Sequence, residues 1–131
     1  MKLLLAISIF LASTLANALP TVVESWGGTG IGLMVLSDGS AQIQFDCGSG
    51  SVPANRWLAG QSRNKAVGTM TPHTGVRPPP GYQPRQLKAT YSATTNVPAG
   101  KMSLTVKITG QGPAQIYRLS LGAEPVLRRC M

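Results

Sequence analysis

The stretch KMSLTVKI, residues 101–108, decides the fold class. Apolar side chains alternate with polar ones at every position, so one row would face a core and the other would face water. The apolar row is Met102, Leu104, Val106 and Ile108. A strict period of two is typical of a strand in an antiparallel sheet. The stretch therefore predicts a β-strand with one wet face.

The same alternation recurs outward from this stretch in both directions. It predicts strands at 87–93, 114–121 and 126–131, and short strands at 55–59 and 65–71. Clusters of Gly, Pro and Asn separate most of these runs and are typical of turns. No stretch of ten or more residues after position 18 carries a helical stripe.

Near the amino terminus, the sequence predicts a hairpin around the three-residue loop Ser37-Asp38-Gly39. A two-residue turn would set apolar residues opposite glutamines, whereas the longer loop sets apolar residues opposite one another. Gly39 would take the left-handed position that such loops need. The first strand would start at Trp26. The predicted pairs are Val35 with Ala41, Leu33 with Ile43, Ile31 with Phe45 and Thr29 with Cys47.

Counted together, these runs predict an all-β domain of eight strands joined in sequence order. We expect a small antiparallel eight-stranded meander barrel, with a two-sheet β-sandwich as the alternative. The length of 131 residues allows one such domain. Its expected bounds are 19–131.

Residues 1–18 have the pattern of a secretory signal peptide. Lys2 supplies a positive start, an apolar run follows, and Ala16-Asn17-Ala18 places small residues where a signal peptidase cuts. The run is shorter than the roughly 20 residues that a membrane span needs. We expect an exported protein, periplasmic or extracellular, without a transmembrane segment after cleavage.

The two cysteines, Cys47 and Cys130, are expected to form a disulfide. An oxidising compartment favours this bond, and two thiols are too few for a zinc site. A reactive or intermolecular thiol is the alternative. In a closed meander both cysteines would lie near one point, because each ends a predicted strand.

Two tryptophans are candidates for structural roles. Trp26 on the first strand and Arg128 on the last would be neighbours in a closed barrel, so the guanidinium either stacks on the indole or is solvated. Trp57 is expected in the core rather than on the surface, because an exposed indole is costly.

The segment 72–86 holds five prolines and is predicted to be a long extended loop. Its candidate partner contacts are His73, Arg77, Tyr82 and Arg85. A loop of this length in a small domain is either functional or a solvated connector. Both interpretations remain open from the sequence.

Composition argues against catalysis. The chain has four carboxylates, one His and two Cys, which leaves too few groups for acid–base, metal or nucleophile sites, and we expect neither enzyme activity nor a cofactor. The net charge of +8 favours weak attraction to anionic surfaces. The dispersed basic residues carry no motif for specific nucleic-acid binding.

Several short motifs occur in a characteristic order. They are Trp26-Gly27-Gly28-x-Gly30, Asp38-Gly39, Phe45-Asp46-Cys47, Met102-x-Leu104-Thr105-Val106 and Leu127-x-x-Cys130. In this order the chain resembles a group of small bacterial secreted β-proteins of unknown activity, although residues 52–63 and the proline-rich loop depart from the pattern. A Trp on the first strand with an Arg on the last also resembles the calycin barrels. The resemblance implies a fold and no ligand.

These observations predict a secreted, non-catalytic binding module, monomeric, whose partner is a protein or an anionic polymer. An envelope-directed protein inhibitor is one version, since exposed loops on a rigid scaffold often carry binding. The alternative is a carrier that holds a small apolar ligand in the barrel lumen.

Overall fold

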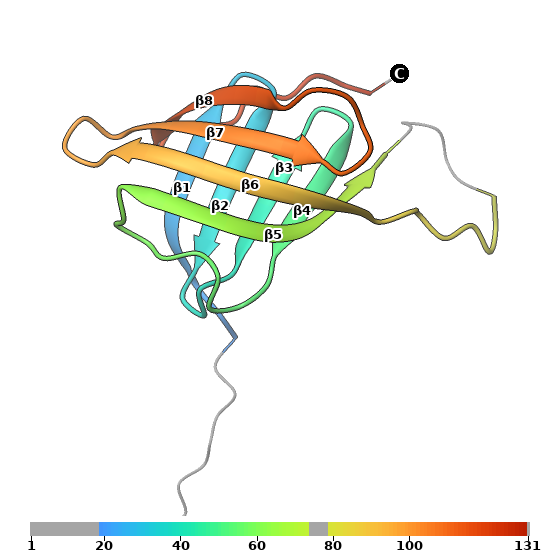
Figure 1. The fold of residues 1–131 in the computed structure, drawn as a ribbon, viewed down its shortest axis with the longest axis horizontal. Coiled ribbons are helices and arrows are strands. Elements are labelled where there is room, and N and C mark those ends of the chain that lie inside the picture. Colours follow the sequence, from blue (N-terminus) through green and yellow to red (C-terminus); the bar gives the residue numbers. More distant parts are fainter. Residues whose placement is uncertain (1–18, 74–78, 131) are drawn as a thin grey trace, which may run out of the picture.

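The computed structural model describes residues 19–73 and 79–130, which form a closed β-barrel without a helix (Figure 1). The strands are β1 (Val22–Gly28), β2 (Ile31–Leu36), β3 (Ala41–Phe45), β4 (Gly48–Val52), β5 (Arg63–Pro72), β6 (Leu87–Asn96), β7 (Lys101–Ile108) and β8 (Gln115–Leu121). Each is antiparallel to the next, and β1 pairs with β8 to close the barrel. The predicted eight-stranded meander barrel is confirmed, and the sandwich alternative is excluded.

The register of the β2–β3 hairpin is as predicted. Val35 lies opposite Ala41, and the pairing continues in step to Ile31 and Phe45. Gly39 has a φ of 77°, the left-handed conformation that the three-residue loop requires. The apolar side chains of both strands therefore point to one side, into the barrel.

The first predicted strand is wrong in one respect, because the chain turns inside it. β1 ends at Gly28 and β2 begins at Ile31, and Gly30 between them has a φ of 77°. Thr29 lies in this turn and β3 already ends at Phe45, so the predicted pairing of Thr29 with Cys47 does not form.

The predicted strand at 55–59 is also wrong, since these residues form a turn and loop. β4 takes its place in the barrel, although its sequence GSGSV has no apolar alternation. Its inward positions include Gly50, where a side chain would overlap the hydroxyl of Tyr91. The strand was not predicted because two of its three inward positions, Gly48 and Gly50, are glycine, and only Val52 adds an apolar side chain to the core.

The last predicted strand, 126–131, does not form, since residues 126–130 are a tail outside the strands and Met131 lies outside the described residues. Only an isolated parallel bridge joins Val126 to Thr29. Residues 123–125, which lead into this tail, cross the outer side of β1 and β2, where a side chain at Gly27 would overlap the Ala123 carbonyl and one at Gly32 would overlap Pro125. The glycines of the first strands therefore make room for the tail.

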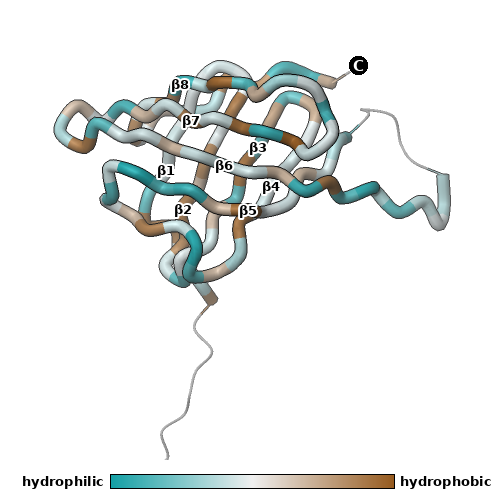
Figure 2. The backbone as a smooth tube through the Cα atoms, in the orientation of Figure 1, coloured by the Kyte–Doolittle hydropathy of each residue, from teal (hydrophilic) through white to brown (hydrophobic). Residues whose placement is uncertain are grey.

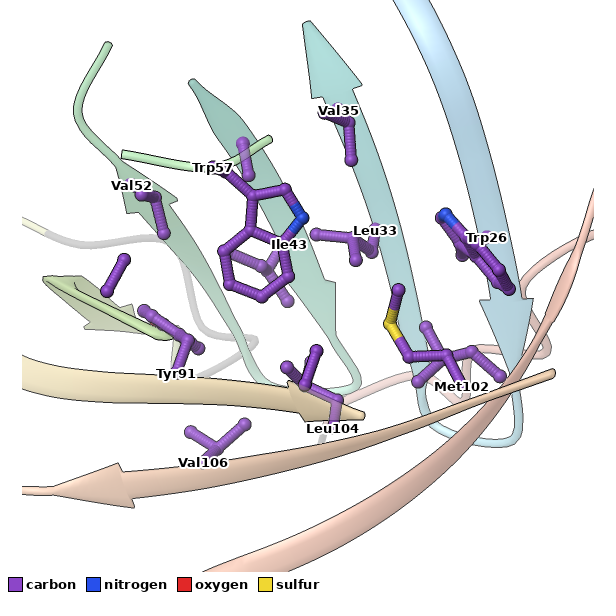
Figure 3. Close-up of a cluster of buried hydrophobic side chains, with 14 of the residues drawn as sticks. Trp26, Leu33, Val35, Ile43, Val52, Trp57, Tyr91, Met102, Leu104 and Val106 are labelled. Atoms are coloured by element: carbon purple, nitrogen blue, oxygen red, sulfur yellow. The ribbon is translucent and has the colours of Figure 1, made fainter. Parts of the chain in front are cut away.

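Large apolar side chains fill the interior of the barrel (Figure 3). The largest fully buried ones are Trp57, Tyr91, Ile31, Leu33, Ile43, Leu104, Leu119, Val35 and Val52. The prediction that Trp57 belongs to the core is confirmed. Burial of this kind stabilises a domain by about 1.5–3 kcal/mol per large side chain relative to exposure.

Candidate functional site

The two ends of the barrel differ in construction. One end holds the 37–40 turn and the loop 53–62, and we call it the Trp57 end. The other holds the turns 29–30, 46–47 and 109–114, and we call it the disulfide end. The β5–β6 connection, which contains the proline-rich segment, also starts from the disulfide end (Figure 1).

At the Trp57 end, a loop folds inward and closes the barrel. The backbone N–H groups of Asn55 and Trp57 donate to the carbonyls of Asp38 and Gly39, at 3.0 and 2.9 Å, which fixes the loop on the β2–β3 turn. Trp57 is 1% exposed, and its indole N–H has no hydrogen-bond partner among the described residues. The hydroxyl and the backbone N–H of Ser40 donate hydrogen bonds to the Asp38 carboxylate, and these bonds stabilise the same turn. They also lower the pKa of the Asp38 carboxyl.

At the disulfide end, the barrel is open and forms a pocket of about 270 Å³. Its lining is Gly30, Phe45, Asp46, Cys47, Met70, Val106, Ile108, Gln111, Pro113, Gln115 and Tyr117. The rings of Phe45 and Tyr117 lie 5.7 Å apart at 54°, and both are half-buried. The pocket thus has an apolar floor and a rim of amides and one carboxylate.

Tyr117 has its hydroxyl on the polar side of this pocket. The hydroxyl donates to Gln115 Oε1 at 2.8 Å. Burial, and then the negative charge of Asp46, raise the pKa of Tyr117, so the phenol stays neutral and can donate. The residue offers an aromatic face together with a hydrogen-bonding tip, a combination that is frequent in binding sites.

The disulfide predicted between Cys47 and Cys130 is present and lies beside this pocket. Asp46 accepts a hydrogen bond of 2.7 Å from the backbone N–H of Arg128, which holds the tail against the β3–β4 turn. The carbonyl oxygen of His73 lies 3.2 Å from the sulfur of Cys130. The pocket rim is therefore braced by a covalent bond and by the tail.

Trp26 and Arg128 lie toward different ends. The indole of Trp26 is buried and donates to Glu24 Oε1 at 3.4 Å, and it lines a small cavity with Trp57. Arg128 is exposed at the disulfide end, because the residues before it carry the chain across β1 and β2 to that end. The exposed guanidinium of Arg128 is therefore solvated and does not stack on the buried indole of Trp26.

The proline-rich segment begins one residue later than predicted. Pro72 is the last residue of β5, opposite Gly48, and a proline is tolerated there because no ladder hydrogen bond from its nitrogen is needed. His73 then continues along the barrel edge, donating its backbone N–H to the Cys47 carbonyl at 2.9 Å, with its ring Nε2 3.2 Å from Ser49 Oγ.

The other predicted contact residues of this segment are separated from His73. Residues 79–86 are exposed and extend away from the barrel (Figure 1), and their trace is pale to teal in Figure 2. Tyr82 is 56% exposed and Arg85 is exposed. Arg77 and residues 1–18, the predicted signal peptide, lie outside the described residues.

Sequence reasoning missed the pocket itself. Its lining comes from the last inward positions of the strands and from three turns, which no single stretch of sequence brings together. The sequence did contain one signal for the pocket. Phe45 and Tyr117 are inward aromatic residues, and each lies near the end of its strand that reaches the disulfide end of the barrel.

Chemically, the pocket can bind but holds few reactive groups. Both cysteines are in the disulfide, and no group of three or more metal-ligating side chains occurs within 19–73 and 79–130.

In the same part of the chain, no helix is long and apolar enough to cross a membrane. Comparison with models of known protein families, with curated proteins and with solved structures gives no match.

Proposed function

We propose that the protein is an exported, non-catalytic binding module that takes a protein partner at the disulfide end of its barrel. The observation that carries this proposal is the asymmetry of the two ends. Trp57 closes one end, whereas the other end is open and presents half-buried aromatic rings beside an exposed proline-rich segment. Half-buried aromatic residues on a rigid support are typical anchors of protein interfaces.

Rigidity supports the proposal. The Cys47–Cys130 bond and the Arg128–Asp46 hydrogen bond fix the rim before any partner arrives. A preorganised surface loses little conformational freedom on binding, so more of the contact energy appears as affinity. An inhibitor that presses this rim and the segment 79–86 against a hydrolase of the cell envelope is one version of the function.

The alternative carrier function has less support. A carrier needs an empty lumen, and in this barrel side chains such as Leu33, Tyr91 and Leu104 occupy the interior (Figure 3). The pocket at the mouth, about 270 Å³, lies just below the 300–1,000 Å³ range that is typical of small-ligand sites.

Export is part of the proposal. The leader-like sequence of residues 1–18 supports it, and the disulfide fits it, because such bonds persist in oxidising compartments. The full chain and the mature form would then differ only outside the barrel.

Site-specific photo-cross-linking tests the proposal. A benzophenone amino acid is placed at Gln115 on the rim, at Tyr82 on the segment, or at Leu58, which is 58% exposed at the Trp57 end. In cells that export the protein, Gln115 and Tyr82 should give the same protein adduct and Leu58 should give none. An adduct formed from Leu58 alone, or no adduct at any position, would contradict the proposal.

A further inference from the structure

We propose that the outward side of β5–β8 is a binding surface for an anionic polysaccharide, a sugar chain that carries carboxylate or sulfate groups. This cationic face is distinct from the disulfide-end site, so the inference goes beyond the proposed function and does not rest on it. It follows from how the fold distributes charge.

The acidic and basic residues of the chain are strongly segregated. The only carboxylate side chains are those of Glu24, Asp38, Asp46 and Glu124. None lies in β5–β8 or in any residue between positions 46 and 124. One half of the barrel wall therefore contains cations without acidic residues to neutralise them.

The basic side chains of these strands all point outward and are exposed. Inward positions between them are buried, as the alternating burial of β6 and β7 shows. The cations of the face are Arg63 and Lys65 on β5, Lys88 on β6, Lys101 and Lys107 on β7, and Arg118 on β8. In the view of Figure 1 these four strands lie in front of β1–β4.

Strand register brings cations that are far apart in sequence into one row. Arg63 lies opposite Thr94, Thr94 opposite Ser103, and Ser103 opposite Arg118. Neighbouring strands are about 4.8 Å apart, so this row spans roughly 14 Å across the four strands. Two guanidinium groups thus flank two hydroxyl groups, a spacing that a sugar chain with regularly placed anions can match.

Hydroxyl groups fill the positions between the cations. Thr90 lies opposite Lys107, and Ser92 lies opposite both Lys65 and Thr105. Such groups both donate and accept hydrogen bonds, which suits sugar hydroxyls. Lys101 already donates to Ser120 Oγ at 2.8 Å, and Lys107 donates to the Gly112 carbonyl, but each ammonium has further donors for an anion.

The face suits a polysaccharide better than a nucleic acid or a membrane. It has no outward aromatic residue on which bases could stack, since Tyr91 points inward and Tyr117 lines the pocket. Its exposed apolar residues, Val67 and Ile116, are on opposite edges, β5 and β8, and form no patch for insertion. A barrel wall is also curved, and a flexible polymer can follow a curve better than a flat bilayer can.

The test compares two variants of equal net charge. The face variant carries Lys65→Gln, Lys88→Gln and Arg118→Gln. The control variant carries Arg56→Gln, Arg128→Gln and Arg129→Gln, all exposed and all outside β5–β8. Fluorescence anisotropy then measures affinity for a heparin oligosaccharide as the polysaccharide probe, over a range of salt concentrations. Parallel titrations use a single-stranded oligonucleotide and vesicles of phosphatidylglycerol in phosphatidylcholine.

The face variant should bind heparin at least about tenfold more weakly at physiological salt, and its plot of log affinity against log salt should lose about two units of slope. The control variant should stay within about twofold of the parent protein. Equal losses in both variants would overturn the inference, because net charge alone would then explain binding. So would tighter, face-dependent binding to the oligonucleotide or to the vesicles, or no heparin binding by the parent protein. Circular dichroism of all variants checks that the barrel is intact.

Discussion

Removing the disulfide should destabilise the protein strongly. We would change Cys47 and Cys130 to Ser together, so that no free thiol remains. The bond links residues 83 positions apart in sequence. On the chain-entropy model, opening such a loop costs about 4.5 kcal/mol at 25 °C, mainly because the unfolded chain gains freedom. That is a large share of the 5–15 kcal/mol that is the free energy of unfolding of a typical domain.

The folded state of this variant should keep its shape. Besides the disulfide, Val126 exchanges backbone hydrogen bonds of 3.0 and 2.8 Å with Gly28 and Gly30, and Arg128 donates to Asp46. These contacts should hold the tail, so the loss should appear in the free energy of unfolding rather than in the spectrum of the native protein.

Urea titration, followed by the fluorescence of the two buried tryptophans, measures that loss. The serine variant should unfold at a lower urea concentration than the parent protein. Its free energy of unfolding should also fall more steeply with urea, because its unfolded chain is less compact. Reductant should bring the parent protein to the same curve and leave the variant unchanged. A loss of less than about 1 kcal/mol in the free energy of unfolding would refute the reasoning. So would a parent protein whose unfolding curve does not change with reductant.

Three further results are expected. Trp57→Ala should lower the free energy of unfolding by about 3–5 kcal/mol and Leu58→Ala by less than about 0.5, measured by urea titration, because one side chain fills the barrel end and the other is exposed. Burial raises the pKa of Tyr91 to about 12, and the unfolded phenol ionises near 10, so stability measured against pH should fall between these values and should fall less in Tyr91→Phe. Replacing 79–86 by a Gly/Ser linker of equal length should leave the melting temperature unchanged and abolish the cross-link expected at Gln115 on the rim, because the segment contacts the same partner.

Local alternation was enough to predict most of the strands. β6 and β7 bury alternate side chains, and in β8 the same alternation leaves Tyr117 half-buried and Leu119 buried. This pattern is readable from sequence alone. The β2–β3 register followed from matching apolar rows. Export and strand-end geometry together led to the Cys47–Cys130 disulfide, which the structure contains.

The errors in the predicted strands have a common cause, which is contact between distant parts of the chain. β4 shows no apolar alternation because Gly50 leaves its space to Tyr91, a residue of β6. The segment 126–130 alternates like a strand but does not pair as one in the barrel, because residues 123–125 before it carry the chain over Gly27 and Gly32. Tertiary context overrides local pattern in both places.

The two binding surfaces were beyond sequence reasoning for a similar reason. The pocket collects strand ends, such as Phe45 and Tyr117, and the cationic face collects basic residues such as Arg63 and Arg118 through strand register. In sequence these residues are dispersed. Only the order and register of the strands make them neighbours.

Hydrogen–deuterium exchange, with and without the partner captured by cross-linking, tests the central claim most directly. Binding at the disulfide end should slow exchange in the 46–47 and 109–114 turns and in residues 79–86, and should leave the 37–40 turn and the loop 53–62 unchanged. Slowed exchange confined to the 37–40 turn and the loop 53–62 would contradict the account, because the partner would then bind the end that Trp57 closes.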